Sequence, residues 1–514
     1  MWPWEKSERG KWATPLSTAR TNGRMGLPSL DWRTQQLYGE TLPRGVMTPR
    51  FMADRPPFNY WMAPEQLAAM HWVPGQIVLG KIAGTMIGHM DDRPLVTIAG
   101  SRAGKTSTVL EPNLYLYPGS MLVLDPKCEL AQRSAAIRRA LGHQVIVLDP
   151  FHQSGLPASM WNALEELGEI PYDDSIIDDV AGITQALIVD DPNGGSRHWN
   201  DSARVLLQGI ILFTLTLPDG RDLVTVRQLL TLTHPRLLDA ARSRKKADGK
   251  FDDEYFDENK AAIETLLKAM ASHDDFFGGI LAGIARRFLS TPTNERGSIF
   301  STAAAQTDFL DSLPLREMSR LSDFHLSDLR SDRPTTIYLC LPVGRMISHY
   351  RWLRLVVQLA CSVLERMGSY PRSRTPILFL MEEFAVLQHL AIMEQAVAYF
   401  PGFGIKLWCV LQDISQLTRY YAESAETFLG NAGLIQTFAN GDEATLGYIA
   451  RRLDKLIVPF ELRQAFSRNH HSQLLMMEGE APAAAIRLEH DDVEEIRNRA
   501  IALAWELAQT RDRP

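Results

Sequence analysis

Short apolar runs rich in β-branched residues alternate with helix-like segments in the first third of the chain. The runs are residues 94–99 (PLVTIA), 120–124 (SMLVL) and 144–148 (QVIVL). Their length and composition are typical of buried strands. Residues 106–115 and 129–141 lie between them and have helical character, and Pro112 is expected to bend or end the first of these helices. Strand, helix, strand, helix, strand at this spacing predicts a parallel sheet with crossover helices.

The pattern changes in the middle of the chain. From about residue 171 to residue 310 the strand signals vanish and helical periodicity dominates, as in residues 201–217 and 259–271. The charged segment 243–257 (SRKKADGKFDDEYFD) indicates a loop or an exposed insertion. Strand signals then resume at residues 335–341, 376–381, 406–411 and 434–438. The pattern therefore predicts an α/β fold that is interrupted by an all-helical insertion.

The composition is that of an ordinary globular protein. Of 514 residues, 45% are hydrophobic and 22% are charged, which excludes a disordered chain, a collagen-like repeat and a disulfide-stapled miniprotein. The net charge of −7 (54 − 61) excludes a basic protein that coats nucleic acid without specificity. A local basic channel could still hold DNA. The four cysteines include no pair at CxxC spacing, so we expect no zinc cluster and a cytoplasmic location.

No segment of the sequence has the character of a membrane span or a leader. The N-terminal residues lack an apolar signal-peptide core, and residues 1–75 are rich in Trp, Pro, Met and Arg without a sustained period. The longest apolar stretches, such as 205–217, are shorter than the ~18–20 residues that cross a bilayer. We therefore expect a soluble chain that begins with an irregular arm.

A phosphate-binding turn is the sharpest chemical signal. Residues 99–106 (AGSRAGKT) follow an apolar strand and open a helix. Small residues let backbone N–H groups curl around a phosphate, the lysine neutralises phosphate charge, and the threonine hydroxyl binds Mg²⁺. This is the P-loop pattern, with Ala99 in place of the usual first glycine. The predicted ATP-binding residues are Gly100, Ser101, Arg102, Ala103, Gly104, Lys105, Thr106 and Ser107.

Two adjacent acids end a second apolar strand. Glu382 and Glu383 follow residues 377–381 (ILFLM). We expect Glu382 to hold Mg²⁺ together with Thr106, and Glu383 to polarise the attacking water as a catalytic residue beside Lys105. On its own such a pair would equally suit a solvated strand end.

Other polar residues also follow apolar strands. Gln412 follows residues 408–411 (WCVL), and we expect it to sense the γ-phosphate or to position water. Asp125 and Lys127 follow another strand and could line the same sheet edge, where ligands bind in open α/β folds. The predicted order is an irregular arm (1–75), a nucleotide-binding domain in two parts (76–170 and 311–514) and an all-helical insertion (171–310).

Several motifs in one order resemble the type IV secretion coupling proteins, the TraG/TraD family of conjugative DNA-transfer ATPases. The motifs are SRAGKT (101–106), LVLDPKCEL (122–130), WNAL (161–164), MEEFAVL (381–387), GFGIKLWCVLQDISQL (402–417) and GNAGLIQTFAN (430–440). The resemblance implies a RecA-like P-loop NTPase domain with a parallel-rich sheet and an inserted all-α domain. It also implies homo-hexamers that bind ATP and Mg²⁺ between subunits. The implied partners are relaxase-bound single-stranded DNA or protein effectors, and a type IV secretion channel.

The sequence also departs from this family. Members usually begin with transmembrane helices, so this chain is expected to reach the inner membrane through partners. Glu382 stands where aspartate is more frequent, and Cys128 stands where many members have glycine. Pro401 stands where some members have an arginine. The arginine that acts on a neighbouring subunit therefore has only candidates, which are Arg345, Arg351, Arg354 and Arg451.

Three functions remain open on this basis. The first is a DNA-pumping coupling ATPase, and the second is a nucleotide-gated receptor that docks protein substrates and hydrolyses ATP little. The third is a DNA translocase similar to FtsK or HerA. By analogy the helical insertion recognises substrate, while the other interpretation is that it only packs against the motor domain.

Overall fold

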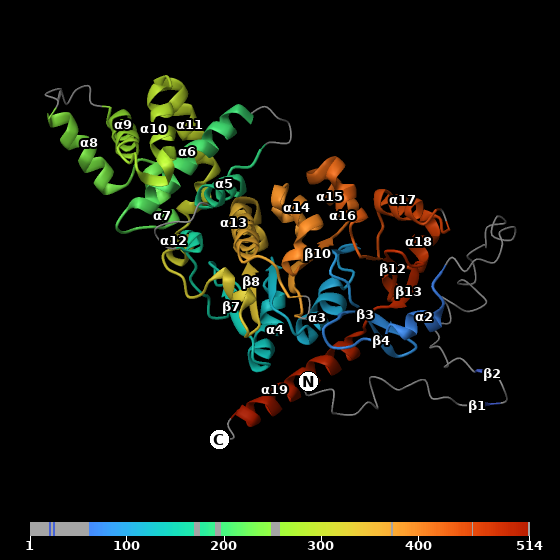
Figure 1. Cartoon of the computed structure of the whole chain (residues 1–514). Helices are drawn as coiled ribbons and strands as arrows, with labels where there is room; N and C mark the ends of the chain where they lie inside the picture. Colours follow the sequence, from blue (N-terminus) through green and yellow to red (C-terminus); the bar gives the residue numbers. More distant parts are fainter. Residues whose placement is uncertain are drawn as a thin grey trace. The chain divides into compact units, whose positions relative to one another are not determined.

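The computed structural model describes residues 61–168, 175–190, 197–247, 257–371, 374–454 and 456–511, with the backbone of residues 20–21 and 24–25. Most of the predicted arm (1–75) lies outside the described residues. The chain forms two compact units, which Figure 1 draws. The sheet unit comprises Met1–Val145, Leu329–Cys340 and Ser369–Pro514, and the helical unit comprises Ile146–Asp328 and Leu341–Gly368. The predicted domain boundaries at 171 and 310 stay a prediction.

One large sheet organises the sheet unit. Its strand order is β4-β3-β13-β12-β11-β5-β10-β9-β6-β8-β7. The strands are β3 (Ile77–Ile82), β4 (Thr85–His89), β5 (Leu95–Ala99), β6 (Met121–Asp125), β7 (Gln144–Leu148), β8 (Thr335–Cys340), β9 (Ile377–Met381), β10 (Ile405–Leu411), β11 (Leu434–Phe438), β12 (Ser472–Met477) and β13 (Ala483–Ile486). A separate pair consists of β1 (Arg20–Thr21) and β2 (Arg24–Met25).

The middle of the sheet is parallel. Strand β5 runs parallel to β11 and to β10, β10 runs parallel to β9, and β6 runs parallel to β9 and to β8. Every residue of β5, β6, β9, β10 and β11 is buried. Strands covered on both faces read as continuous apolar runs, which is why these strands could be located from the sequence. The predicted parallel-rich α/β fold is confirmed.

Four strands extend this sheet in antiparallel fashion, and none of them was predicted from the sequence. Strand β11 pairs antiparallel with β12, followed by β13, β3 and β4. The β3–β4 hairpin turns at Ala83 and Gly84, which have φ of 48° and 79°. A type I′ hairpin turn needs positive φ at both positions, and alanine gives no such signal. Strand β13 is rich in alanine and would favour a helix outside this sheet.

Two groups of helices accompany the sheet. Helices α3, α4 and α19 pack against one another, as do α14 to α17, and Figure 1 draws the strands between these groups. The helices of this unit are α2 (Pro64–Ala69), η3 (Thr106–Leu110), α3 (Glu111–Leu116), α4 (Glu129–Ala140), η9 (Phe384–Leu387), α14 (Ala391–Tyr399), η10 (Phe400–Phe403), α15 (Ile414–Tyr421), η11 (Ala422–Ser424), α16 (Ala425–Gly430), α17 (Glu443–Arg452), α18 (Pro459–Ala465), η12 (Arg468–His470) and α19 (His490–Arg511).

The helix that follows the phosphate-binding turn does not end at Pro112. It begins with a π-helical segment, η3, in which the N–H of Glu111 bonds to the carbonyl of Thr106, and it continues as α3 to Leu116. Pro112 falls in the first turn of α3, where a missing N–H and a fixed φ are tolerated. Pro112 therefore does not end the helix, and the alternative that it bends the helix stays a prediction.

The helical unit is built from nine α-helices among its described residues. They are α5 (Ile176–Leu187), α6 (Arg197–Thr216), α7 (Leu223–Leu230), α8 (Pro235–Ala247), α9 (Glu258–Ala271), α10 (Ile280–Ser290), α11 (Thr293–Gln306), α12 (Leu313–Met318) and α13 (Met346–Arg366). Short 3₁₀ turns are η4 (Ala163–Leu167), η5 (Phe276–Gly279), η6 (Asp308–Asp311) and η8 (Val343–Arg345), while η7 (Leu326–Arg330) crosses the unit boundary along the chain.

The helical prediction for the middle of the chain is confirmed. Residues 175–190, 197–247 and 257–310, the described part of this segment, contain no strand. The predicted loop at 243–257 is partly wrong, because α8 continues to Ala247; residues 248–256 lie outside the described residues. Among the helices that are described, none is both long and apolar enough to span a bilayer.

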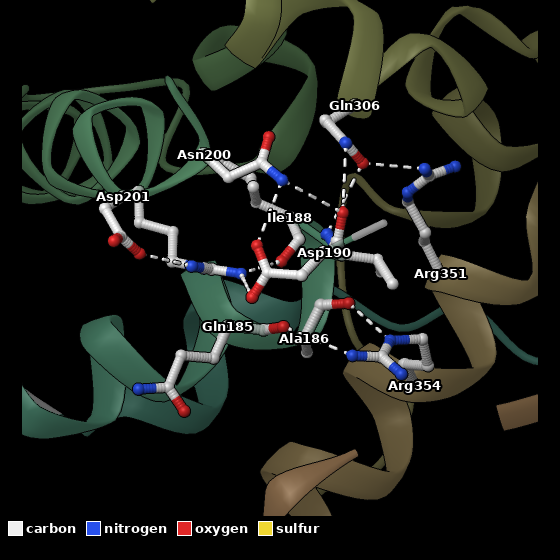
Figure 2. Close-up of polar contacts among 11 residues, drawn as sticks. Gln185, Ala186, Ile188, Asp190, Asn200, Asp201, Gln306, Arg351 and Arg354 are labelled. Carbon is white, nitrogen blue, oxygen red and sulfur yellow. Dashed lines mark hydrogen bonds and ion pairs between the residues drawn. The ribbon is translucent and has the colours of Figure 1, made fainter. Parts of the chain in front are cut away.

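A polar network joins four helices of the helical unit (Figure 2). The guanidinium of Arg354 on α13 donates to the carbonyl of Ala186 at 2.8 Å, at the end of α5. Arg204 on α6 donates to the carbonyl of Ile188 at 2.9 Å and pairs with Asp190. These cations satisfy carbonyls that the last turn of α5 leaves without intrahelical partners. The network therefore fixes where α5 ends.

The buried charge of Lys406 should lower the stability of the sheet unit, and this effect can be tested. It is buried near the start of β10 and donates to the carbonyl of Asp91, whose carboxylate lies nearby. Burial lowers the pKa of Lys406 to about 8. An unfolded lysine keeps a pKa near about 10.4, so the cost of burying the charge is complete below pH 8. This cost disappears as the pH rises through the interval between these two values.

We expect Lys406→Met to raise the unfolding midpoint at pH 7. Met fills a similar volume without a buried charge, and Arg93 still satisfies the Asp91 carboxylate. The gain over the parent protein should shrink from pH 8 to pH 10, as followed by thermal unfolding at each pH. The exposed Lys260→Met is the control and should leave the midpoint unchanged. A gain that is constant from pH 7 to pH 10 would contradict this origin of the effect.

Candidate functional site

The residues that the sequence predicts to bind and hydrolyse nucleotide lie together at the carboxyl ends of the parallel strands. Strand β5 ends at Ala99 and leads into the phosphate-binding turn, β9 ends before Glu382, and β10 ends before Gln412. In the register, Leu411 lies opposite Ile98, and Cys409 lies opposite Met381. Strand β10 therefore places Gln412 between the turn and the two acids.

The turn from Gly100 to Lys105 has the conformation that a phosphate cradle requires. Arg102 has φ 56° and Gly104 has φ 86°, so successive backbone groups curl rather than extend. A Cβ at Gly100 would collide with the carbonyl of Ala439 on the neighbouring strand end, which explains the glycine. The turn opens directly into helix η3, whose first N–H groups have no intrahelical acceptor. Such amides at a helix N-terminus form an anion-binding site.

Lys105 and Thr106 face the acidic residues. The Lys105 ammonium donates to the carbonyls of Ala99 at 2.5 Å and of Gly100 at 3.2 Å. Burial lowers the pKa of Lys105, although the nearby charges of Glu383 and Glu382 oppose this shift. The Thr106 hydroxyl donates to Glu382 Oε1 at 2.6 Å. The two halves of the predicted site, 276 positions apart in sequence, are therefore in direct contact.

Glu382 lies in a buried and acidic corner. Its side chain is buried, its Oε2 atom has no hydrogen-bond partner among the described residues, and burial raises its pKa. Asp125, at the end of the adjacent strand β6, is buried as well; burial, with a smaller effect of the Glu382 charge, raises its pKa to about 7. Asp125 accepts the N–H of Ala131 at 2.8 Å and so caps α4. Lys127 is exposed beside this corner.

Glu383 is held by two glutamine amides. Gln412 Nε2 donates to Glu383 Oε2, and Gln416 Nε2 donates to Glu383 Oε1, both at 3.1 Å. Ser101 in the turn donates through its hydroxyl to Gln412 Oε1 at 2.9 Å. A chain of hydrogen bonds therefore runs from the phosphate-binding turn to the second acid. Ser101, Gln412 and Glu383 were predicted from the sequence, whereas Gln416 was missed.

A cavity of about 500 Å³ lies beside the turn and is lined in part by Arg102, Ala103 and Gly104. Its lining includes Arg102, Arg468, Arg487, His471 and His490. The Arg487 guanidinium is buried, lies 4.3 Å from the centroid of the Phe438 ring, and donates to the carbonyl of Ala103 at 2.5 Å. Burial lowers its pKa to about 10. Sequence reasoning missed Arg487, because its partner lies 384 positions away and no local pattern links them.

Cys128 is buried and adopts a left-handed conformation with φ 61° at the start of α4. A glycine would adopt this conformation without steric cost, whereas a residue with a Cβ is strained there. This conformation gives a physical reason for the glycine that the resemblance associates with the position. The left-handed conformation of this residue was not predictable from the local sequence.

The structure separates the four arginine candidates. Arg345 and Arg451 are exposed. Arg351 donates to Gln306 at 2.7 Å, and Arg354 is buried with its guanidinium on the carbonyl of Ala186 (Figure 2). A buried guanidinium that satisfies a helix end is not accessible to a second subunit, so Arg354 is removed from the candidates.

Comparisons with known proteins show what the chain is similar to. Conjugal transfer protein TraG of Escherichia coli is 26% identical over 393 residues, which cover 69% of this chain and 55% of the relative. Protein VirD4 of Agrobacterium fabrum is 25% identical over 364 residues, which cover 70% of this chain and 49% of the relative. The chain thus spans about half the length of the curated relatives it matches.

The fold is shared with solved coupling proteins. The unbound bacterial conjugative coupling protein TrwB aligns with a TM-score of 0.62 and 16% identity, covering 84% of this chain and 92% of that chain. TrwB in complex with ADP and Mg²⁺ aligns with a TM-score of 0.60, 16% identity, and coverage of 84% and 93%. Residues 74–474 match the family described as type IV secretory system conjugative DNA transfer. The chain belongs to this family of type IV coupling proteins, as the resemblance of its motifs predicted.

Proposed function

We propose that this chain is an ATP-driven coupling protein that binds ATP and Mg²⁺ at the phosphate-binding turn and uses hydrolysis to deliver DNA to a type IV secretion channel. The hydrogen bond between Thr106 and Glu382 carries this proposal, because it joins the turn to the acids that nucleotide hydrolysis requires. Two further observations support it, namely membership of the family and the fold shared with TrwB, a protein solved in complex with ADP and Mg²⁺.

The residues present fit a Mg²⁺ ion. Thr106 offers a hydroxyl, and the buried Glu382 Oε2 has no hydrogen-bond partner in the part of the chain that the structure describes. Mg²⁺ usually takes one or two protein oxygens and completes its shell with phosphate oxygens and water. The ion would neutralise charge on the β- and γ-phosphates when bound. Glu382 is one carbon longer than the more frequent aspartate, yet it reaches the threonine at normal hydrogen-bond distance.

The other residues of the site have distinct proposed roles. Lys105 binds the β- and γ-phosphate oxygens, and Glu383 accepts the proton of the attacking water at a carboxylate oxygen. Gln412, which bonds to both Ser101 and Glu383, senses the γ-phosphate. The turn residues from Gly100 to Ser107 bind phosphate through backbone N–H groups. The cavity lined by Arg487 holds the ribose and base.

The proposed partners follow from the family and the names of the relatives. We propose that the chain forms homo-hexamers and receives relaxase-bound single-stranded DNA, or protein effectors, for transfer into the secretion channel. TraG is named as a conjugal transfer protein, which supports this assignment. We further propose that the chain acts in the cytoplasm and reaches the inner membrane through partner proteins.

A second candidate is a nucleotide-gated receptor for protein substrates with little hydrolysis. Two departures from the family favour it, namely Glu382 where aspartate is more frequent and Pro401 where some members have an arginine. A third candidate is a translocase similar to FtsK or HerA, which the same turn and acids would serve. A neighbouring relaxase gene would separate conjugation from this third candidate.

The test is an ATPase assay with single-stranded DNA, with duplex DNA and without DNA. We expect measurable hydrolysis that requires Mg²⁺ and rises several-fold with single-stranded DNA, because the motor turns over when its substrate is engaged. Tight ATP binding with negligible turnover under all three conditions would contradict the motor and favour the receptor. The salt concentration is held constant, because phosphate contacts weaken steeply with salt.

A further inference from the structure

Each oxygen of the Glu383 carboxylate accepts one hydrogen bond, and only one of the two donor residues also contacts the phosphate-binding turn. Gln412 bonds to Oε2 and also to Ser101 in the turn, whereas Gln416 bonds to Oε1 from the first turn of α15. We propose that Gln416 is a positioning residue that sets the plane of the Glu383 carboxylate for ATP hydrolysis. This inference rests on the proposed function.

The Gln416 side chain is itself fixed by the start of α15. Asp413 caps this helix by accepting the backbone N–H of Gln416 at 3.0 Å. The side-chain oxygen of Gln416 accepts the backbone N–H of Gln412 at 2.8 Å. A backbone N–H can only donate, so the amide oxygen of Gln416 must face it, and the amide nitrogen must face Glu383. The orientation of this amide therefore follows from its partners.

Two donors hold the carboxylate more firmly than one. A single hydrogen bond leaves a carboxylate free to rotate about its last bond, whereas one donor on each oxygen sets its plane. Each oxygen keeps a further lone pair that can accept the proton of a water molecule. A misplacement of about 1 Å at such a group costs about a hundredfold in rate. Gln416 thus holds Glu383 in place without contacting the nucleotide.

Two variants separate this role from the helix cap. Gln416→Met removes the amide donor and the acceptor while it keeps the length of the side chain. Gln416→Glu keeps an oxygen for the N–H of Gln412, but it replaces the donor by a negative charge that faces Glu383. We expect turnover numbers about tenfold below the parent in Gln416→Met, and at least as low in Gln416→Glu. Neither the KM nor the Kd for ATP should change, because neither contact reaches the phosphates.

The experiment measures kcat, KM, the Kd for ATP and the unfolding midpoint for the full chain with Mg²⁺. Ser415→Ala, an exposed change on the same turn, is the control and should match the parent. A low kcat with parent-like Kd and midpoint in Gln416→Glu supports the inference. A parent-like kcat in both variants would overturn the positioning role of Gln416 but not the proposed function. A lower ATP affinity combined with a lower unfolding midpoint would do the same. A parent protein that binds ATP without hydrolysis overturns the proposed function, and the positioning role with it.

Discussion

Glu383→Gln is expected to lower the turnover number for ATP hydrolysis by at least about a hundredfold while ATP still binds. The amide has the same shape but cannot accept the proton of the attacking water, so the loss falls on the transition state. A hundredfold corresponds to about 2.7 kcal/mol of transition-state stabilisation. The Kd should change little, because Glu383 contacts Gln412 and Gln416 rather than the phosphate-binding turn. Single-turnover kinetics and equilibrium titration with ATP provide the two readouts.

Glu423→Gln is the matched control for this prediction. Glu423 is an exposed acid that follows α15, and its loss should leave both kcat and Kd at parent values. Glu383→Gln that hydrolyses ATP at the parent rate would show that another group activates the water. The unfolding midpoint should also stay close to that of the parent, since the amide keeps one of the two hydrogen bonds at this position.

The sequence was most informative for motifs that lie within a few consecutive residues and for strands that are buried on both faces of the sheet. The central strands, from β5 to β11, were predictable because parallel strands covered on both faces are short apolar runs. The phosphate-binding turn was predictable because its small residues, its lysine and its hydroxyl lie within eight consecutive positions. The acids at the end of β9 followed from the same rule, because carboxyl ends of parallel strands meet at one edge.

The rest depends on contacts that no local pattern records. Strand β13 is an alanine-rich segment that becomes a strand only because β12 and β3 flank it. Arg487 reaches the turn from the far end of the chain, so its role required the fold. Gln416 did have a signal, since an aspartate followed three residues later by glutamine is typical of a helix start. That signal predicts a cap, and only the structure shows the amide on Glu383.

Lys105→Ala is expected to weaken ATP binding itself, by tenfold to about a hundredfold in Kd. A charge-assisted hydrogen bond contributes about 1.5–3 kcal/mol. Of the two basic side chains in the turn, Lys105 is partly buried and Arg102 is exposed. The ammonium donates to the carbonyls of Ala99 and Gly100, which places it at the base of the turn. The measurement is titration with ATP and Mg²⁺, together with the shift that ATP causes in the unfolding midpoint.

A control lysine and a comparison with Glu383→Gln test whether the loss of ATP binding is specific to Lys105. Lys268→Ala removes a surface lysine of α9 that forms an exposed ion pair with Glu264, so its ATP affinity should equal that of the parent. Lys105→Ala should lose the ATP-induced shift of the midpoint, whereas Glu383→Gln should keep it, because one change removes binding and the other removes chemistry. Unchanged ATP affinity in Lys105→Ala would show that residues 100–107 do not hold the triphosphate, and the assignment of the phosphate-binding turn would be lost even if the acids lie close to it.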